Sequence, residues 1–198
     1  MLKIIECEQG SPEWFQARCG IVTASCLSDV LAKGQGKTRK TYLLKLAGER
    51  ITGNPTESYT NVHMERGKEQ EAVARQIYIE RTGYEIKECG FMVDGSLGYS
   101  PDGLLGDDGL VEIKTKLAHL QAEVLLSDKV PSEHMAQIQG GLLVSGRCYL
   151  DFISYCPNMP IFIKRVERDE AYLGTLKEEL ARFEAELSET VAKLLGKF

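Results

Sequence analysis

The chain has 198 residues, of which 43% are hydrophobic and 27% are charged, and its formal net charge at pH 7 is −5. These are the proportions of a soluble globular protein, and no apolar run is long enough to span a membrane. The six cysteines form no CxxC pair, which favours reduced thiols over a disulfide or zinc framework. The first residues lack the layout of a signal peptide, so we expect a cytoplasmic protein.

Two helices are predicted near the N-terminus. The first covers residues 11–19, has a Ser-Pro-Glu start and carries Arg18. The second begins near Thr23 and Ser25 and runs to residue 32. Hydroxyl groups and free backbone N–H groups at a helix start favour anions, so this region could bind a phosphate. A plain pair of helices with a surface arginine explains the same pattern, and both interpretations stay open.

Residues 33–45 hold five basic side chains and no acidic one. The stretch either contacts a polyanion or is a solvated connection into a helix over 41–51. The negative net charge weighs against binding nucleic acid by bulk attraction but does not exclude a local basic groove. A long helix over 60–81 follows.

Strands are predicted over 84–93 and 97–100, and the second leads to a tight turn at Asp102. Residues 110–114 alternate as a strand does, so Glu112 and Lys114 project from the same face. Two clustered carboxylates can hold a hard cation such as Mg²⁺, and the lysine adds a positive charge or a proton acceptor. A turn followed by a cross-strand ion pair is the alternative.

The remaining chain predicts helices over 117–126 and from residue 131 onward, then strands over 149–155 and 161–166. Gln137 lies among apolar neighbours of the second helix, so it either bonds a backbone group or reaches a site. A last helix over 169–195 has apolar residues at three- and four-residue steps, which favours a core-facing stripe over a subunit contact. We therefore expect one α/β domain over 1–198, with a mixed central sheet flanked by helices and a long C-terminal helix.

Several motifs occur in an order that resembles one nuclease family. The sequence resembles the phage lambda exonuclease family, or YqaJ-type viral recombinases and alkaline exonucleases, within the PD-(D/E)xK nuclease superfamily. The matching pieces span nearly the whole chain and are Trp14-x3-Arg18-x4-Thr23-Ala24-Ser25, Gly67-Lys68-x2-Glu71, Ser100-Pro101-Asp102-Gly103, Glu112-Ile113-Lys114 and Met135-Ala136-Gln137-x-Gln139. The resemblance implies a PD-(D/E)xK, restriction-endonuclease-like core.

It also implies a catalytic set. Asp102 and Glu112 would bind divalent metal ions, with Glu71 adding a carboxylate to the second ion. Lys114 would position or activate the attacking water, and Gln137 would orient the water or a ligand. Two Mg²⁺ ions are expected, and Mn²⁺ could replace them.

The DNA contacts implied by the resemblance come from the N-terminal half. Arg18 and Ser25 would hold the 5′ phosphate with help from Thr23, and Trp14 belongs to the same motif. Met64 falls near the family's apolar wedge, which separates the end base pair.

The family's activity implies a Mg²⁺-dependent 5′→3′ exonuclease that digests one strand of linear duplex DNA to mononucleotides. The products would be 3′ single-stranded overhangs for annealing-type recombination. The expected partners are DNA ends, two further copies of the chain in a ring-shaped homotrimer, and a single-strand annealing protein, without a membrane. A phage or prophage gene in a bacterial cell would encode it. The alternatives are a structure- or sequence-specific endonuclease of the same superfamily and a non-catalytic DNA-end adaptor.

Overall fold

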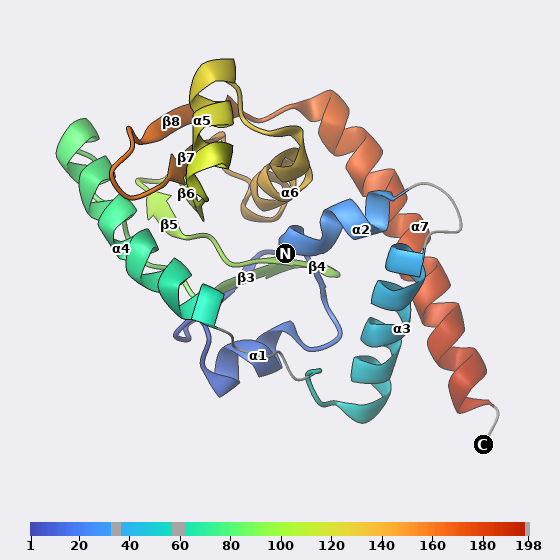
Figure 1. Cartoon of the computed structure of the whole chain (residues 1–198). Coiled ribbons are helices and arrows are strands. Elements are labelled where there is room, and N and C mark those ends of the chain that lie inside the picture. The colour runs from blue at the N-terminus through green and yellow to red at the C-terminus, as the bar shows by residue number, and fades with distance from the viewer. Residues whose placement is uncertain (33–36, 57–61, 197–198) are drawn as a thin grey trace.

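The computed structural model describes residues 1–32, 37–56 and 62–196, and the side chains of residues 62–66 and 68 lie outside that description (Figure 1). The strands are β1 (Lys3–Ile5), β2 (Val22–Thr23), β3 (Phe91–Asp94), β4 (Leu97–Tyr99), β5 (Gly103–Leu105), β6 (Gly109–Thr115), β7 (Tyr149–Tyr155) and β8 (Phe162–Glu167). The helices are α1 (Pro12–Arg18), α2 (Leu27–Leu31), α3 (Lys37–Thr52), α4 (Val62–Thr82), α5 (Ala118–Ser127), α6 (Met135–Ser145) and α7 (Glu170–Leu195). Two 3₁₀ turns, η1 (Ala24–Cys26) and η2 (Ser132–His134), precede α2 and α6.

In the part of the chain that the structure describes, the strands form two four-stranded sheets, with the orders β1-β3-β4-β2 and β5-β6-β7-β8. In the second sheet β6 and β7 are parallel while the other pairs are antiparallel, so this sheet is mixed, as predicted. The first sheet also mixes both kinds of pairing. The connection from β4 to β5 carries Asp102 from one sheet to the other, and this crossing places the candidate site between them.

Helices cover both faces of the second sheet. The helix α4 packs on β6 and β7 and encloses a cluster that includes Tyr78, Val111 and Ile153. On the other side α6 packs against β7 and against β3 and β4 of the first sheet. Figure 1 shows α7 running along α3 at the edge of the molecule. The predicted core-facing stripe of α7 is confirmed, because its inward side chains are buried: Leu173, Leu176, Leu180, Phe183 and Leu187.

Local sequence explains several element boundaries. The side chain of Ser11 accepts a hydrogen bond from the backbone N–H of Trp14, which begins α1 as predicted. Asp169 caps α7 in the same way, accepting from two backbone N–H groups. Gly146 ends α6 in the left-handed region with φ of 71°.

Two predicted boundaries are wrong. The strand expected over 84–93 begins only at Phe91, because residues 84–88 are largely exposed. Among the described residues their pairing is limited to one isolated bridge, between Lys87 and Leu104. The second N-terminal helix is a 3₁₀ turn followed by the short α2, instead of one continuous helix. Within the described residues no helix is long and apolar enough to cross a membrane.

Candidate active site

The strand β6 presents Glu112 at the centre of the site. Glu112 is 2% exposed, and its Oε1 lies 2.7 Å from Nζ of Lys114, two positions along the same face of the strand. The same oxygen accepts a hydrogen bond of 2.5 Å from Nε2 of Gln137 on α6. Oε2 accepts a hydrogen bond of 2.7 Å from the phenol of Tyr99, at the end of β4. The predicted Glu112, Lys114 and Gln137 therefore meet.

Asp102 lies in the turn between β4 and β5 and is tied to β6. Its Oδ2 accepts from the backbone N–H of Ile113 at 2.6 Å, and its own N–H donates to the carbonyl of Val111 at 3.1 Å. Burial raises the pKa of Asp102 well above its usual value, and the nearby carboxylates of Glu112 and Glu71 raise it further. The fold thus holds these acidic groups close enough to repel one another.

Glu71 approaches the same place from α4. Its carboxylate accepts a hydrogen bond of 3.1 Å from Arg75, one helical turn later. Burial raises the pKa of Glu71, Arg75 lowers it, and Glu112 raises it again. Both Glu71 and Arg75 line one cleft with Asp102.

Lys114 is a positive charge in this setting. Burial lowers the pKa of its ammonium group, but the adjacent Glu112 raises it, helped by Asp102 and Glu71, and the net result is a pKa above the usual value. Beside these carboxylates the ammonium form of Lys114 is therefore favoured over the neutral amine.

The acidic groups fit a hard cation such as Mg²⁺ or Mn²⁺, which takes oxygen ligands. Among the residues that the structure describes, no three histidine, cysteine or carboxylate side chains converge into a complete cage. Mg²⁺ needs no such cage, since it typically uses one or two carboxylates together with water and substrate phosphate oxygens. Asp102 and Glu112 offer two carboxylates of this kind, and a cation would relieve their mutual repulsion.

A second polar group lies at the other side of the cleft. Arg18 stacks over Trp14, with its guanidinium carbon 4.0 Å from the ring centroid. Both side chains donate hydrogen bonds to the hydroxyl of Ser100, at 3.3 Å from Arg18 and 2.8 Å from Trp14. The hydroxyls of Thr23 and Ser25 lie 3.3 Å apart at the start of η1. We call Trp14, Arg18, Thr23, Ser25 and Ser100 the Arg18 pocket.

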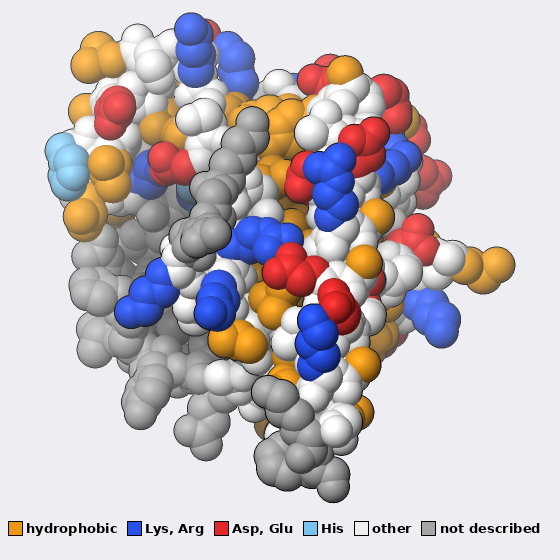
Figure 2. Space-filling view, turned by 90° about the vertical axis from the view of Figure 1, so that its right-hand side faces the viewer, with side chains coloured by type: hydrophobic (Ala, Val, Ile, Leu, Met, Phe, Trp, Pro, Cys, Tyr) orange, Lys and Arg blue, Asp and Glu red, His pale blue; other side chains and the backbone are white. Residues whose placement is uncertain are grey.

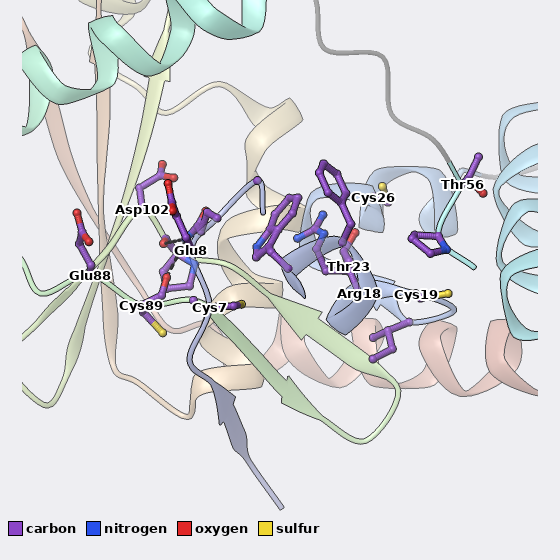
Figure 3. A pocket seen from close by; sticks show the side chains of 18 of the residues that line it. Cys7, Glu8, Arg18, Cys19, Thr23, Cys26, Thr56, Glu88, Cys89 and Asp102 are labelled. Carbon is purple, nitrogen blue, oxygen red and sulfur yellow. Dashed lines mark hydrogen bonds between the residues drawn. The ribbon is translucent and has the colours of Figure 1, made fainter. Parts of the chain in front are cut away.

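Residues of both groups line one cleft of about 1120 Å³: Trp14, Arg18 and Thr23 of the Arg18 pocket, and Glu71 and Asp102 of the acidic site. Figure 3 shows Asp102 on one side of this cleft and Arg18 with Thr23 on the other. Ser100 joins the two parts, because it contacts Arg18 and lies two residues before Asp102.

Other residues that the sequence indicates for DNA contact lie outside the described residues or at the surface. Met64 is in α4, but its side chain lies outside the described residues, as does Lys33. Lys37 is exposed, and Arg39 pairs with Glu186 of α7 at 2.6 Å between nitrogen and oxygen. The predicted basic stretch over 33–45 is therefore partly engaged within the protein.

Three residues of the site are not predicted from the sequence: Tyr99, Arg75 and, in its contact with Trp14, Ser100. Arg75 follows Glu71 by four helical positions, which is a readable signal for an ion pair. Ser100 lies inside the Ser-Pro-Asp-Gly motif, but no local pattern places it against Trp14. Tyr99 gives no local signal, because its partner Glu112 lies on another strand.

Comparison with known proteins decides the family. The model of the YqaJ-like viral recombinase domain matches residues 13–148. Two crystal structures of LHK-Exo, an alkaline exonuclease from Laribacter hongkongensis, are 36% identical and cover 94% of this chain and 97% of their own. Their TM-scores are 0.87 for the complex with dAMP and 0.86 for the other structure. The chain belongs to the YqaJ-like viral recombinase family.

This membership confirms the resemblance and the PD-(D/E)xK-like fold, and it makes the chain a nuclease of the exonuclease type. A phage-related exonuclease from Haemophilus somnus is 13% identical and has a TM-score of 0.66, with 88% of this chain and 96% of that chain covered. That likeness supports the fold alone. A search of the curated proteins found no match to the chain.

Proposed function

We propose that this YqaJ-like nuclease is a Mg²⁺-dependent exonuclease that digests the 5′-ended strand of linear duplex DNA and leaves 3′ single-stranded overhangs. The observation that carries the proposal is the pairing of two sites in one cleft. Asp102 and Glu112 form an acidic site beside the positively charged ammonium of Lys114. Arg18 lines the same cleft as Asp102. The first group suits phosphodiester cleavage, and the second suits a terminal phosphate.

In the acidic site, Asp102 and Glu112 would hold the metal, with Glu71 reaching a second ion. A pair of such ions neutralises the phosphate and lowers the pKa of a bound water. Tyr99 and Gln137 hold the two oxygens of Glu112 in place, which orients that carboxylate before substrate arrives. The Lys114 ammonium can donate to the attacking water or to the phosphate.

The Arg18 pocket would select the DNA end. A terminal phosphate carries more negative charge than an internal phosphodiester, and a guanidinium with hydroxyl donors favours it. Burial lowers the pKa of Arg18, yet a guanidinium stays charged at any physiological pH. Because Ser100 links this pocket to the turn of Asp102, binding of the end would place the next phosphodiester near the acidic site.

We also propose a ring-shaped homotrimer around DNA and a single-strand annealing protein as the partner, both from family resemblance. Enclosure by a ring reconciles the net charge of −5 with DNA binding, since fewer bulk attractions are needed. Figure 2 shows the side of the molecule with α3 and α7, where basic and acidic side chains lie among one another. Arg50 of α3 forms an ion pair with Glu184 of α7. Because acidic side chains offset the basic ones on this face, we propose the cleft as the DNA contact.

The test uses linear duplex DNA labelled at either the 5′ or the 3′ end, with Mg²⁺ or with chelator. We expect early release of the 5′ label as a mononucleotide, and no release in chelator. Asp102→Ala should abolish digestion while the circular dichroism spectrum stays that of wild type. Undiminished digestion by that variant would refute the acidic site.

Two alternatives make different predictions. An endonuclease of the same superfamily would nick or linearise a closed circular duplex that has no free end. A DNA-end adaptor without catalysis would bind linear duplex without releasing nucleotides. The Arg18 pocket argues against the first, and the intact set of Asp102, Glu112 and Lys114 argues against the second.

A further inference from the structure

The Arg18 pocket depends on a short connection between α1 and η1. Arg18 ends α1, and Thr23 and Ser25 follow after only a few residues. Gly20 and Thr23, within this connection, are both buried. The distance between the guanidinium and the hydroxyls is therefore set by how this connection is held.

The helix α3 holds the beginning of the connection at Gly20. The backbone N–H of Gly20 donates to Oε2 of Glu49 at 2.9 Å, and its carbonyl accepts from Nε of Arg50 at 2.8 Å. Gly20 has φ of +70°, and a Cβ there would lie 2.8 Å from Cγ of Arg50. The backbone N–H and the carbonyl of Gly20 are thus both bound by α3, through its neighbouring residues Glu49 and Arg50.

The same helix holds the end of the connection at Thr23. The backbone N–H of Thr23 donates to the phenol oxygen of Tyr42 at 3.1 Å. Tyr42 is 7% exposed and precedes Glu49 by seven residues, or two helical turns, so both side chains lie on one face of α3. Glu49 is 6% exposed, and its second oxygen accepts from the N–H of Thr56 at 3.0 Å.

The helix α3 is itself fixed by α7. Arg50 donates to both carboxylate oxygens of Glu184, at 2.5 and 2.9 Å. The ring of Tyr42 stacks on Phe183, with 5.8 Å between the centroids. Two of the three residues that hold the connection, Tyr42 and Arg50, are therefore attached to α7, a long, well-packed helix that runs along α3 (Figure 1).

We propose that Tyr42 and Glu49 are positioning residues of the Arg18 pocket, which set the spacing of Arg18 from the hydroxyls of Thr23 and Ser25. The inference rests on the proposed recognition of a 5′ phosphate. A phosphate that contacts the guanidinium and the hydroxyls together is sensitive to their spacing, since misplacement by about 1 Å can cost on the order of 100-fold in rate. A 5′-hydroxyl end has no terminal phosphate to contact these groups, so its digestion is less sensitive.

The test compares kcat/KM on duplexes that have a 5′ phosphate or a 5′ hydroxyl and are otherwise identical. Tyr42→Phe keeps the ring against Phe183 but removes the acceptor for the Thr23 N–H. Glu49→Gln keeps one acceptor oxygen and leaves one of its two backbone donors unpaired. We expect each variant to lower the phosphate-to-hydroxyl ratio at least tenfold through KM, with kcat at saturating DNA close to wild type.

Two controls separate positioning from general stability. Leu44→Ala, on the exposed side of α3 at 48% exposure, should change neither the ratio nor the activity. Thermal unfolding of every variant reports the folded fraction at the assay temperature. Glu49→Asp should lower the phosphate-to-hydroxyl ratio less than Glu49→Gln does, because it keeps a carboxylate at this position.

Each outcome is informative. An equal fall on both substrates would overturn the positioning role and leave Tyr42 and Glu49 as structural residues. If Arg18→Ala lowers the phosphate-to-hydroxyl ratio while Tyr42→Phe and Glu49→Gln leave it unchanged, the inference fails and the proposed function stands. If Arg18→Ala itself keeps the ratio, the proposed end recognition fails and the inference fails with it.

Discussion

The phenol of Tyr99 donates a hydrogen bond of 2.7 Å to Oε2 of Glu112, and both side chains are almost fully buried. The bond crosses from β4 of one sheet to β6 of the other. It fixes one oxygen of the carboxylate, while Gln137 and Lys114 contact the other oxygen. The orientation of Glu112 is thus determined by three side chains from three elements.

Tyr99→Phe should therefore weaken the site without removing a ligand. Loss of a residue that orients a metal-binding carboxylate typically costs about 10–100-fold in metal affinity or activity. We expect the Mg²⁺ concentration for half-maximal digestion to rise by that order. Tyr172→Phe, on α7 away from the cleft, is the matched control. An unchanged Mg²⁺ titration for Tyr99→Phe would show that the bond serves folding alone.

Asp102→Asn should inactivate the enzyme and stabilise it when no metal is present. Because burial and the neighbouring carboxylates raise the pKa of Asp102, its ionised form is less favourable in the fold than in the unfolded chain. Wild-type stability therefore falls as pH rises through the folded pKa, and Asn avoids this loss. In chelator at pH 8 the variant should unfold at a higher temperature, and the gap should close in acid.

Added Mg²⁺ should reverse the order of the two unfolding temperatures, so that wild type becomes more stable than Asp102→Asn. A ligand that binds only the folded state stabilises that state. Wild type should gain thermal stability with Mg²⁺ and Asp102→Asn should gain little. An equal gain by both proteins would contradict a metal at Asp102.

His134 should make the fold sensitive to mild acid. Burial lowers the pKa of His134 to about 4, and the positive charges of Lys116 and Lys114 contribute, partly offset by Glu133. Its imidazole lies 3.2 Å from Nζ of Lys116. Because the folded pKa is below the unfolded value, the contribution to stability is present above pH 6.5 and is lost as pH falls toward 4.

The pKa of His134 falls from 6.5 to about 4, and at about 1.4 kcal/mol per pKa unit the loss of stability in acid is at most about 3.5 kcal/mol. His134→Gln keeps an acceptor for Lys116 and does not titrate. Urea unfolding between pH 6.5 and 4 should show a smaller loss of stability for this variant. Parallel curves for the two proteins would assign the acid sensitivity to other groups.

Tyr78→Phe should destabilise the docking of α4 on the sheet. The phenol of Tyr78 donates at 2.6 Å to Asp151, which also accepts two hydrogen bonds from Arg165. Losing one donor to a buried carboxylate should lower the free energy of unfolding by about 1–3 kcal/mol. Equilibrium urea unfolding checks this. An unchanged midpoint would mean that Arg165 alone satisfies Asp151.

The sequence predicts what depends on neighbouring residues. The Ser11 cap fixes the start of α1, and the alternation within residues 110–114 places Glu112 and Lys114 on one face. The apolar surroundings of Gln137 on α6 also indicate that this amide needs a polar partner. These features follow from capping, strand alternation and burial, which are readable in short windows.

What the sequence does not predict depends on contacts between distant segments. Ser100 contacts Trp14 across 86 positions of the chain, and no local pattern indicates this. The same is true of Gly20 and Glu49, whose contact requires α3 to fold back on the α1 connection. The strand expected over 84–93 is shorter for a related reason: β1 pairs with residues 91–93, and the β pairing of residues 84–90 with the rest of the described chain is limited to the isolated bridge between Lys87 and Leu104.

The most direct test of the account is digestion of one linear duplex in Mg²⁺, followed with a 5′ label and a 3′ label in parallel. We predict that the 5′ label leaves first as a mononucleotide, that the 3′ label stays in long single strands, and that a closed circle remains intact. Earlier release of the 3′ label, or cutting of the closed circle, would contradict it.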